Sequence, residues 1–162
     1  VTVTQDATGT SYAFGISNEG SGPGVTIRNS NITVSVYETG DGWSTGIWNY
    51  ATPGTLINMN GVDVTALGPS VAGSHTYAVR ASVADFRMVN SRLQSSFASI
   101  FDCEGGGSNL FEVQGSILQG RVYKCAGTMN IATSQLDGLV FNYATMRCFN
   151  VYDANLQPVI CP

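Results

Sequence analysis

The chain has 162 residues, which is enough for one domain with a buried core. An apolar content of 43% excludes a disordered composition, and no apolar run is long enough to span a bilayer. The net charge is −4 with a single lysine, so we expect no nucleic-acid binding and no membrane insertion.

A short phrase recurs along the chain. The phrase is eight residues long. Its first, third and eighth residues are apolar, and its fifth is small or turn-forming. Recurrence at such spacings is the signature of a solenoid. A weaker start of the phrase lies at residues 1–3. The six copies, in chain order, span 25–32, 57–64, 86–93, 111–118, 129–136 and 149–156.

A second short apolar segment follows each phrase. Both kinds of segment are rich in Val, Ile, Phe and Tyr, which suits β-strands, and the periodicity of a helix is absent. Because this pattern persists while the loops shorten, we predict coils stacked in register, so that equivalent apolar residues form internal ladders. The first ladder is Ile27, Met59, Met88, Val113, Ile131 and Val151, and the second is Ile16, Ile47, Val79, Ile100, Val122 and Leu139.

The turn position of the phrase is predicted to be a sharp corner. Asn, Gly and Asp tolerate left-handed backbone angles, and a ladder of Asn or Ser side chains could satisfy buried backbone groups there. The predicted corner residues are Asn29, Gly61, Asn90, Gly115, Thr133 and Asp153.

Strand phrases joined at an Asn-Ser corner, as at 29–30 and 90–91, resemble the right-handed parallel β-helix superfamily that includes pectin lyases and tailspikes. The resemblance covers nearly the whole chain. It implies one all-β domain over 1–162, a single-stranded right-handed parallel β-helix of about 6–7 coils that tapers to the C-terminus. The closing segment, 148–161, is similar to the tails of secreted bacterial proteins.

Four cysteines lie in the C-terminal half without C-x-x-C spacing, so a zinc site is not expected. An even count in a lysine-poor chain favours disulfides and an extracellular or cell-surface location, with free buried thiols as the alternative. Cys103 and Cys125 occupy equivalent positions in neighbouring coils, and Cys148 and Cys161 flank the last phrase. We therefore favour the pairs Cys103–Cys125 and Cys148–Cys161.

No catalytic residue, metal or cofactor is predicted, because the acidic residues are scattered along the chain. Asp63 with Arg92, and Asp102 with Lys124, fall on shared outward columns and are interpreted as solvated ion pairs. His75 lacks a recognisable nucleophile or acid partner. A minimal polysaccharide lyase or glycosidase stays an alternative, and a glycosidase would need two carboxylates close together in a groove.

The remaining candidates for function are loops and aromatic residues. Three inserts, Gln5–Ser11, Tyr37–Trp43 and Leu67–Ser74, are predicted to form a shelf at one corner. The outward column beside this shelf is Ser17, Trp48, Arg80, Phe101 and Tyr123, with Trp43 and Tyr50 nearby. Outward rings beside an arginine could stack on sugars or on a partner protein, unless loops or a sister subunit cover them.

We therefore expect a non-enzymatic extracellular structural or adhesive module that binds a glycan or a partner through Trp43, Trp48, Tyr50, Arg80, Phe101 and Tyr123. A subunit of a filament or of a trimeric spike is a further alternative. The first coil would expose an open β edge, so we expect an upstream coil, a sister chain or end-to-end stacking of chains there.

Overall fold

The computed structural model describes residues 1–7, 11–20, 24–38, 42–51, 55–68, 75–82, 84–104, 109–142 and 145–161. Within these ranges the chain forms strands and no helix, so the all-β prediction is confirmed, and no described helix could cross a membrane. The strands are β1 (Thr2–Ala7), β2 (Ser11–Gly20), β3 (Val25–Glu38), β4 (Gly42–Ala51), β5 (Leu56–Leu67), β6 (His75–Ser82), β7 (Asp85–Val89), β8 (Arg92–Glu104), β9 (Leu110–Gln114), β10 (Ile117–Lys124), β11 (Thr128–Ala132), β12 (Gln135–Asp137), β13 (Val140–Asn142) and β14 (Thr145–Phe149).

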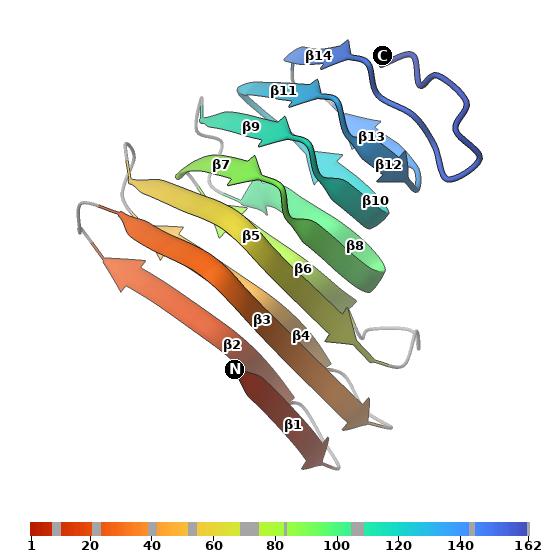
Figure 1. Ribbon diagram of the computed structural model, residues 1–162. Coiled ribbons are helices and arrows are strands. Elements are labelled where there is room, and N and C mark those ends of the chain that lie inside the picture. The colour runs from red at the N-terminus through yellow and green to blue at the C-terminus, as the bar shows by residue number, and fades with distance from the viewer. Residues whose placement is uncertain are drawn as a thin grey trace.

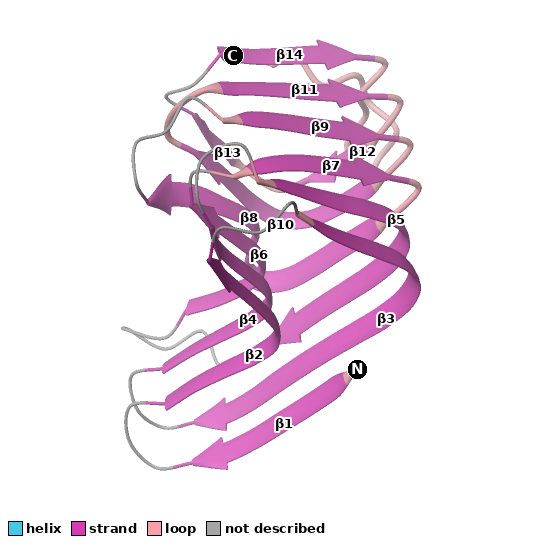
Figure 2. Ribbon diagram, turned by 90° about the vertical axis from the view of Figure 1, so that its left-hand side faces the viewer, coloured by secondary structure: helices cyan, strands magenta, loops and turns pink. Residues whose placement is uncertain are grey.

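The paired strands are parallel and stack in coils from β1 at one end to β14 at the other (Figure 1). The first wall contains the first halves of β3 and β5, followed by β7, β9, β11 and β14. The second wall contains β1, the second halves of β3 and β5, the first halves of β8 and β10, and β12. The third wall contains β2, β4, β6, the second halves of β8 and β10, and β13. This arrangement, seen from the side in Figure 2, is consistent with a β-solenoid.

The core lies between the walls, because alternate residues of each strand point inward. In β5 the inward residues Ile57 and Met59 are buried and their neighbours Leu56 and Asn60 are exposed. Burying each such side chain contributes about 1.5–3 kcal/mol. The first ladder pairs in register as predicted from Ile27 to Ile131, and the second from Ile16 to Val122.

The corner after the first wall has a left-handed backbone in each described coil. A Cβ added to Gly61 would lie 2.8 Å from Oδ1 of Asn29, and one added to Gly115 would lie 2.8 Å from Oδ1 of Asn90. Glycine is therefore required where an asparagine side chain of the preceding coil stacks over the turn. The corner residues and their φ angles are Asn29 (47°), Gly61 (63°), Asn90 (48°), Gly115 (57°), Thr133 (47°) and Asn150 (52°).

A ladder of serines follows these corners and satisfies buried backbone groups. The hydroxyls of Ser91, Ser116 and Ser134 donate to the carbonyl two residues earlier, at 2.7–2.8 Å. Each also accepts the backbone N–H of the equivalent residue in the preceding coil, namely Val62 at 3.0 Å, Ser91 at 3.1 Å and Ser116 at 3.2 Å. The corner is therefore tied from coil to coil by side-chain hydrogen bonds as well as by packing.

The predicted register of the last coil is wrong by three residues. Ile131 pairs with Cys148 rather than with Val151, and Asn150 rather than Asp153 takes the corner conformation. The reason is that 146–148 matches the apolar pattern as well as 149–151 does, once the cysteine is counted as a core residue. Val151 is still buried, because it continues the column of the serine ladder.

Two further sequence-based assignments are wrong, one at each end of the chain. Val122 pairs with Val140, while Leu139 is 64% exposed, because Gly138 at φ 152° redirects the chain after β12. At the other end, Val3 pairs with Val34, so residues 1–3 belong to the second wall and not to the start of a phrase.

Candidate functional site

The outward column predicted on the third wall is present in the strand register. Ser17 pairs with Trp48, Trp48 with Arg80, Arg80 with Phe101, and Phe101 with Tyr123. Because the strands are parallel and in register, these residues lie one above another on the outer face of the wall. The backbone register continues one coil further than predicted, since Tyr123 pairs with Phe141.

Aromatic rings pack against one another around this column. At its first coils, Trp48 stacks on Phe14 with ring centroids 4.5 Å apart and contacts Tyr50 at 6.4 Å. In the middle coils, Phe101 contacts Tyr77 at 4.8 Å and Tyr123 at 5.7 Å. These two groups of rings are bridged by Arg80, which lies over both Trp48 and Tyr77, and together they are called the aromatic cluster.

His75 and Phe97 belong to the same aromatic cluster. Their ring centroids are 4.6 Å apart, and Phe97 also stacks on Tyr123 at 5.7 Å. Arg121 covers the Phe97 ring at 5.3 Å and donates to the Tyr123 hydroxyl at 3.2 Å. Phe14, Tyr77 and Phe97 were not predicted. Phe14 lies three residues before Ser17 and Tyr77 three residues before Arg80, so simple strand alternation places them on the opposite face from those predicted residues.

Arg80 lies inside the aromatic cluster and is not displayed on its surface. Its side chain is only 4% exposed. The guanidinium carbon is 3.9 Å from the centroid of Trp43, 5.7 Å from that of Trp48 and 5.5 Å from that of Tyr77. Such cation–π contacts are worth about 2 kcal/mol when desolvated, so Arg80 organises the rings and does not offer its charge to a ligand.

The accessible part of the aromatic cluster is its rim at the first coils. Tyr12 is 55% and Tyr50 58% exposed, and Tyr12 meets Trp43 edge-on at 5.7 Å. By contrast, Trp48 is half-buried and its indole Nε1 is buried. We call Tyr12, Trp43 and Tyr50 the aromatic rim.

The predicted shelf of inserts falls partly outside the described residues, which omit 8–10, 39–41 and 69–74. The described parts of the first two inserts are not loops, because Asp6 pairs with Tyr37 and Ala7 with Glu38 as β1 and β3 continue. These two inserts are thus shorter than predicted.

The pair Asp102 and Lys124 is not solvated, which corrects the sequence-based interpretation. The two residues pair in register, but Lys124 is 0% and Asp102 5% exposed. Lys124 Nζ donates to Asp102 Oδ2 at 2.5 Å and to Oδ1 of Asn109 at 2.5 Å, and lies 4.6 Å from the ring centroid of Phe111. The missed signal is strand alternation, since Lys124 lies two residues after the buried Val122 and therefore points inward.

Asn109 completes this buried network. Its side chain is 5% exposed, and its Nδ2 donates to Asp102 Oδ2 at 3.0 Å and to the carbonyl of Ala84 at 3.1 Å. The network lies directly behind a disulfide, because the structure pairs Cys103 with Cys125, whose Cα atoms are 4.8 Å apart. Cys148 pairs with Cys161 at a Cα separation of 5.8 Å, so both disulfides connect the cysteines as predicted.

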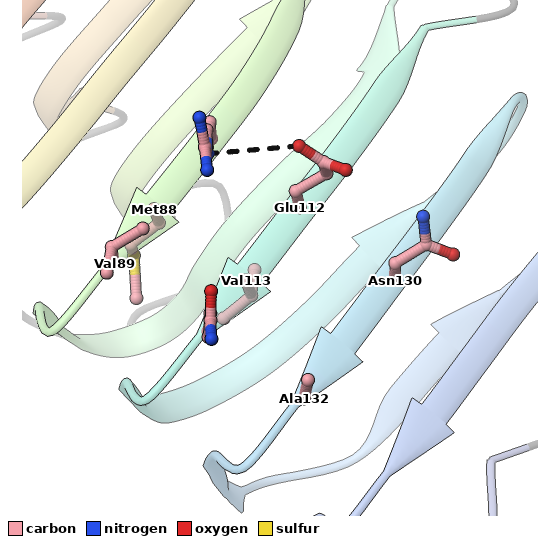
Figure 3. Close-up of a pocket in the computed structure, with 8 residues that line it drawn as sticks. Met88, Val89, Glu112, Val113, Asn130 and Ala132 are labelled. Carbon is pink, nitrogen blue, oxygen red and sulfur yellow. Dashed lines mark ion pairs between the residues drawn. The ribbon is translucent and has the colours of Figure 1, made fainter.

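Asp63, Arg92, Arg87 and Glu112 lie on the surface. Asp63 and Arg92 are neighbours in register, but the guanidinium of Arg92 donates to Gln119 Oε1 of the next coil. A shallow hollow on the first wall contains Arg87 and Glu112, an exposed ion pair with N and O atoms 4.0 Å apart (Figure 3). Pairs of this kind contribute little.

The described residues contain no cluster of three or more His, Cys, Asp or Glu that could hold a metal ion. Asp137 and Asp153 line one hollow near the C-terminus. However, Oδ1 of Asp153 accepts the backbone N–H groups of Asn155 and Gln157 at 2.8 Å each. This carboxylate therefore stabilises a turn, and the hollow gives no support to a pair of catalytic carboxylates.

Comparison of the chain with protein-family models, with curated proteins and with solved structures finds no match.

Proposed function

We propose that the chain is a non-enzymatic extracellular module with a structural or adhesive role, built on a right-handed parallel β-helix of the pectin-lyase type. The parallel stacking of coils and the left-handed corners followed by serines support this fold. Two disulfides support an oxidising environment outside the cell.

The observation that carries the adhesive role is the aromatic rim on a rigid wall. Tyr12, Trp43 and Tyr50 come from adjacent strands, and the rings behind them fix their positions. The apolar faces of neutral sugars stack on such rings, and little conformational entropy is lost because the rings are already ordered. Since Arg80 is enclosed, we expect neutral oligosaccharides and not acidic ones as ligands.

Binding of the purified chain to an array of immobilised oligosaccharides tests this role. Tyr12→Ala and Tyr50→Ala should each weaken binding at least about tenfold, the loss that about 1.4 kcal/mol produces at a contact residue. Phe149→Ala is the matched control, because Phe149 is 67% exposed but lies on the first wall, away from the rim. Equal binding by all variants would exclude the rim, and no binding by the wild type would leave only the structural role.

A second candidate function is self-association through the first coil, whose outer strand edges have no partner among the described residues. Within the described residues, β1 pairs only with β3 and β2 only with β4. Unpaired strand edges favour pairing with another chain. Thr33 N–H donates to Val1 O, so by the alternation of a parallel ladder the N–H of Thr4 points away from β3.

Sedimentation velocity at increasing concentration tests this second candidate. Assembly of the wild type that Thr4→Pro abolishes would support it, because proline removes one outward donor without removing a bond to β3. A monomer at all concentrations, or assembly that Thr4→Pro leaves unchanged, would refute it.

A further inference from the structure

A buried amine, a primary amide and a carboxylate meet behind the Cys103–Cys125 disulfide. The amine is Lys124 at the end of β10, the amide is Asn109 just before β9, and the carboxylate is Asp102 in β8. Lys124 is also the single lysine of the sequence. We propose that the side chains of Lys124 and Asn109 become joined by an intramolecular isopeptide bond, with Asp102 carrying the proton.

The geometry brings the reacting atoms together. Lys124 Nζ is 2.5 Å from Oδ1 of Asn109, so it lies beside the amide carbon that carries this oxygen. Attack requires Nζ to lie about 3–3.5 Å from Cγ itself, so the amine has to leave its hydrogen bond to Oδ1 and turn its lone pair toward the carbon. The second contact of Nζ, to Asp102 Oδ2 at 2.5 Å, and the bond from Asn109 Nδ2 to Ala84 O hold both partners in place.

The reaction needs the amine in its neutral form, and Asp102 is placed to receive the proton. A proton that passes from Nζ to Asp102 Oδ2 converts the ion pair into a neutral amine and a carboxylic acid. Because Lys124 is 0% and Asp102 5% exposed, this transfer removes two charges from a site that excludes water. The neutral amine is the nucleophile that an amide carbon requires.

The reaction balances without a cofactor or an oxidant. Nζ forms a bond to Cγ of Asn109, and Asp102 takes the proton that Nζ releases. The same carboxyl group delivers a proton to Nδ2, which already donates to Asp102 Oδ2 at 3.0 Å. The Cγ–Nδ2 bond then breaks and releases ammonia, which takes the second proton that Nζ has lost and leaves as ammonium, so Asp102 returns to the carboxylate. One ammonium and one primary amide become one secondary amide and one ammonium.

The bond would strengthen the coil that carries it. Asn109 and Lys124 are 15 residues apart, so the isopeptide would close the first, second and third walls of one coil into a ring. The Cys103–Cys125 disulfide connects this coil to the preceding one. The two cross-links together would fix the middle of the stack under mechanical load or after reduction of the disulfides.

Mass spectrometry of the intact, denatured full-length chain tests the proposal. We expect a mass lower by one ammonia than the sequence with two disulfides requires, and a proteolytic fragment in which Asn109 and Lys124 are joined. Asp102→Asn, which keeps the shape of the side chain but cannot take the proton, should carry the full mass. Lys124→Met should also carry the full mass.

The outcomes that would overturn the proposal are distinct. A folded, disulfide-bonded wild type with the full mass would overturn it without reference to any variant. Loss of ammonia in Lys124→Met, or peptide mapping that places the loss in one linear peptide, would assign it to cyclisation of an asparagine onto its own backbone. Cross-linking that persists in Asp102→Asn would remove Asp102 from the mechanism.

Discussion

The serine ladder gives a quantitative prediction for Ser116→Ala. The Ser116 hydroxyl accepts the backbone N–H of Ser91 and donates to the carbonyl of Gln114. That carbonyl keeps a second donor, because it also accepts the N–H of Asn90 at 3.0 Å. The substitution therefore leaves one buried donor, the Ser91 N–H, without a partner.

The cost of one buried unsatisfied N–H is about 1–3 kcal/mol, and we expect Ser116→Ala to lower the free energy of unfolding by this amount. Ser30→Ala is the matched control at the equivalent position of an earlier coil. Its hydroxyl donates to Arg28 O in an exposed hydrogen bond, so its loss should cost less than about 0.5 kcal/mol.

Urea unfolding of the wild type and both variants, followed by circular dichroism, measures this difference as a shift of the midpoint at constant slope. Amide hydrogen exchange provides a local check, because the Ser91 N–H should lose protection in Ser116→Ala. If Ser116→Ala and Ser30→Ala unfold at the same urea concentration, the ladder does not stabilise the corner in the way argued.

Three other predictions follow from the fold. Gly61→Ala should lose about 1–2 kcal/mol in thermal unfolding, because the corner has φ 63° and a Cβ would lie 2.8 Å from Asn29 Oδ1; an unchanged melting temperature would contradict this. Replacing Cys148 and Cys161 with serine should lower the free energy of unfolding by about 2–4 kcal/mol and expose the last coil to limited proteolysis. Arg80→Met, which keeps an unbranched apolar stem but removes the guanidinium, should reduce the free energy of unfolding by about 2 kcal/mol and so lower the melting temperature. An unchanged melting temperature would mean that the cation–π contacts contribute nothing.

The sequence predicted the parts of the fold that depend on spacing. The ladder from Ile27 to Ile131 and the left-handed corner at Asn29 follow from a repeat whose period is set by stacked coils. The cysteine pairs followed for the same reason, since Cys103 and Cys125 lie at equivalent positions of neighbouring coils. Stacking converts equal positions in sequence into neighbours in space, so a repeat fixes contacts that single residues do not.

The sequence did not determine where the repeat ends. Residues 146–148 and 149–151 both fit the apolar pattern, and hydrogen bonding to β11 selects the first. The predicted bounds of the inserts were wrong for a related reason. Polar residues such as Gln5 and Asp6 were assigned to a loop, although they pair with β3. Pairing with a neighbouring strand overrides the weak preferences of individual residues.

The sequence placed the candidate binding residues on strands, but it could not determine which of their side chains are covered by residues of other coils. The strand positions of Trp48 and Arg80 were predicted, but their exposure was not, since it depends on rings contributed by other coils, such as Trp43 and Tyr77. Only the contacts between strands show that Arg80 is enclosed and that the accessible surface is the rim around Tyr12 and Tyr50.

The position of Lys124 shows when charge is a poor guide to exposure. A charged side chain was assigned to the surface because burial of an unpaired ion costs several kcal/mol. Strand alternation from the buried Val122 predicts instead that Lys124 points inward. The inward position is tolerated because Asp102 and Asn109 supply acceptors for the ammonium inside the coil. Removing either acceptor without removing the amine should therefore be far more destabilising than any surface charge substitution. A coil that encloses an amine, an amide and an acid in mutual contact also contains the three groups that an isopeptide bond requires, so the feature that makes this burial tolerable is the same one that makes the cross-link possible.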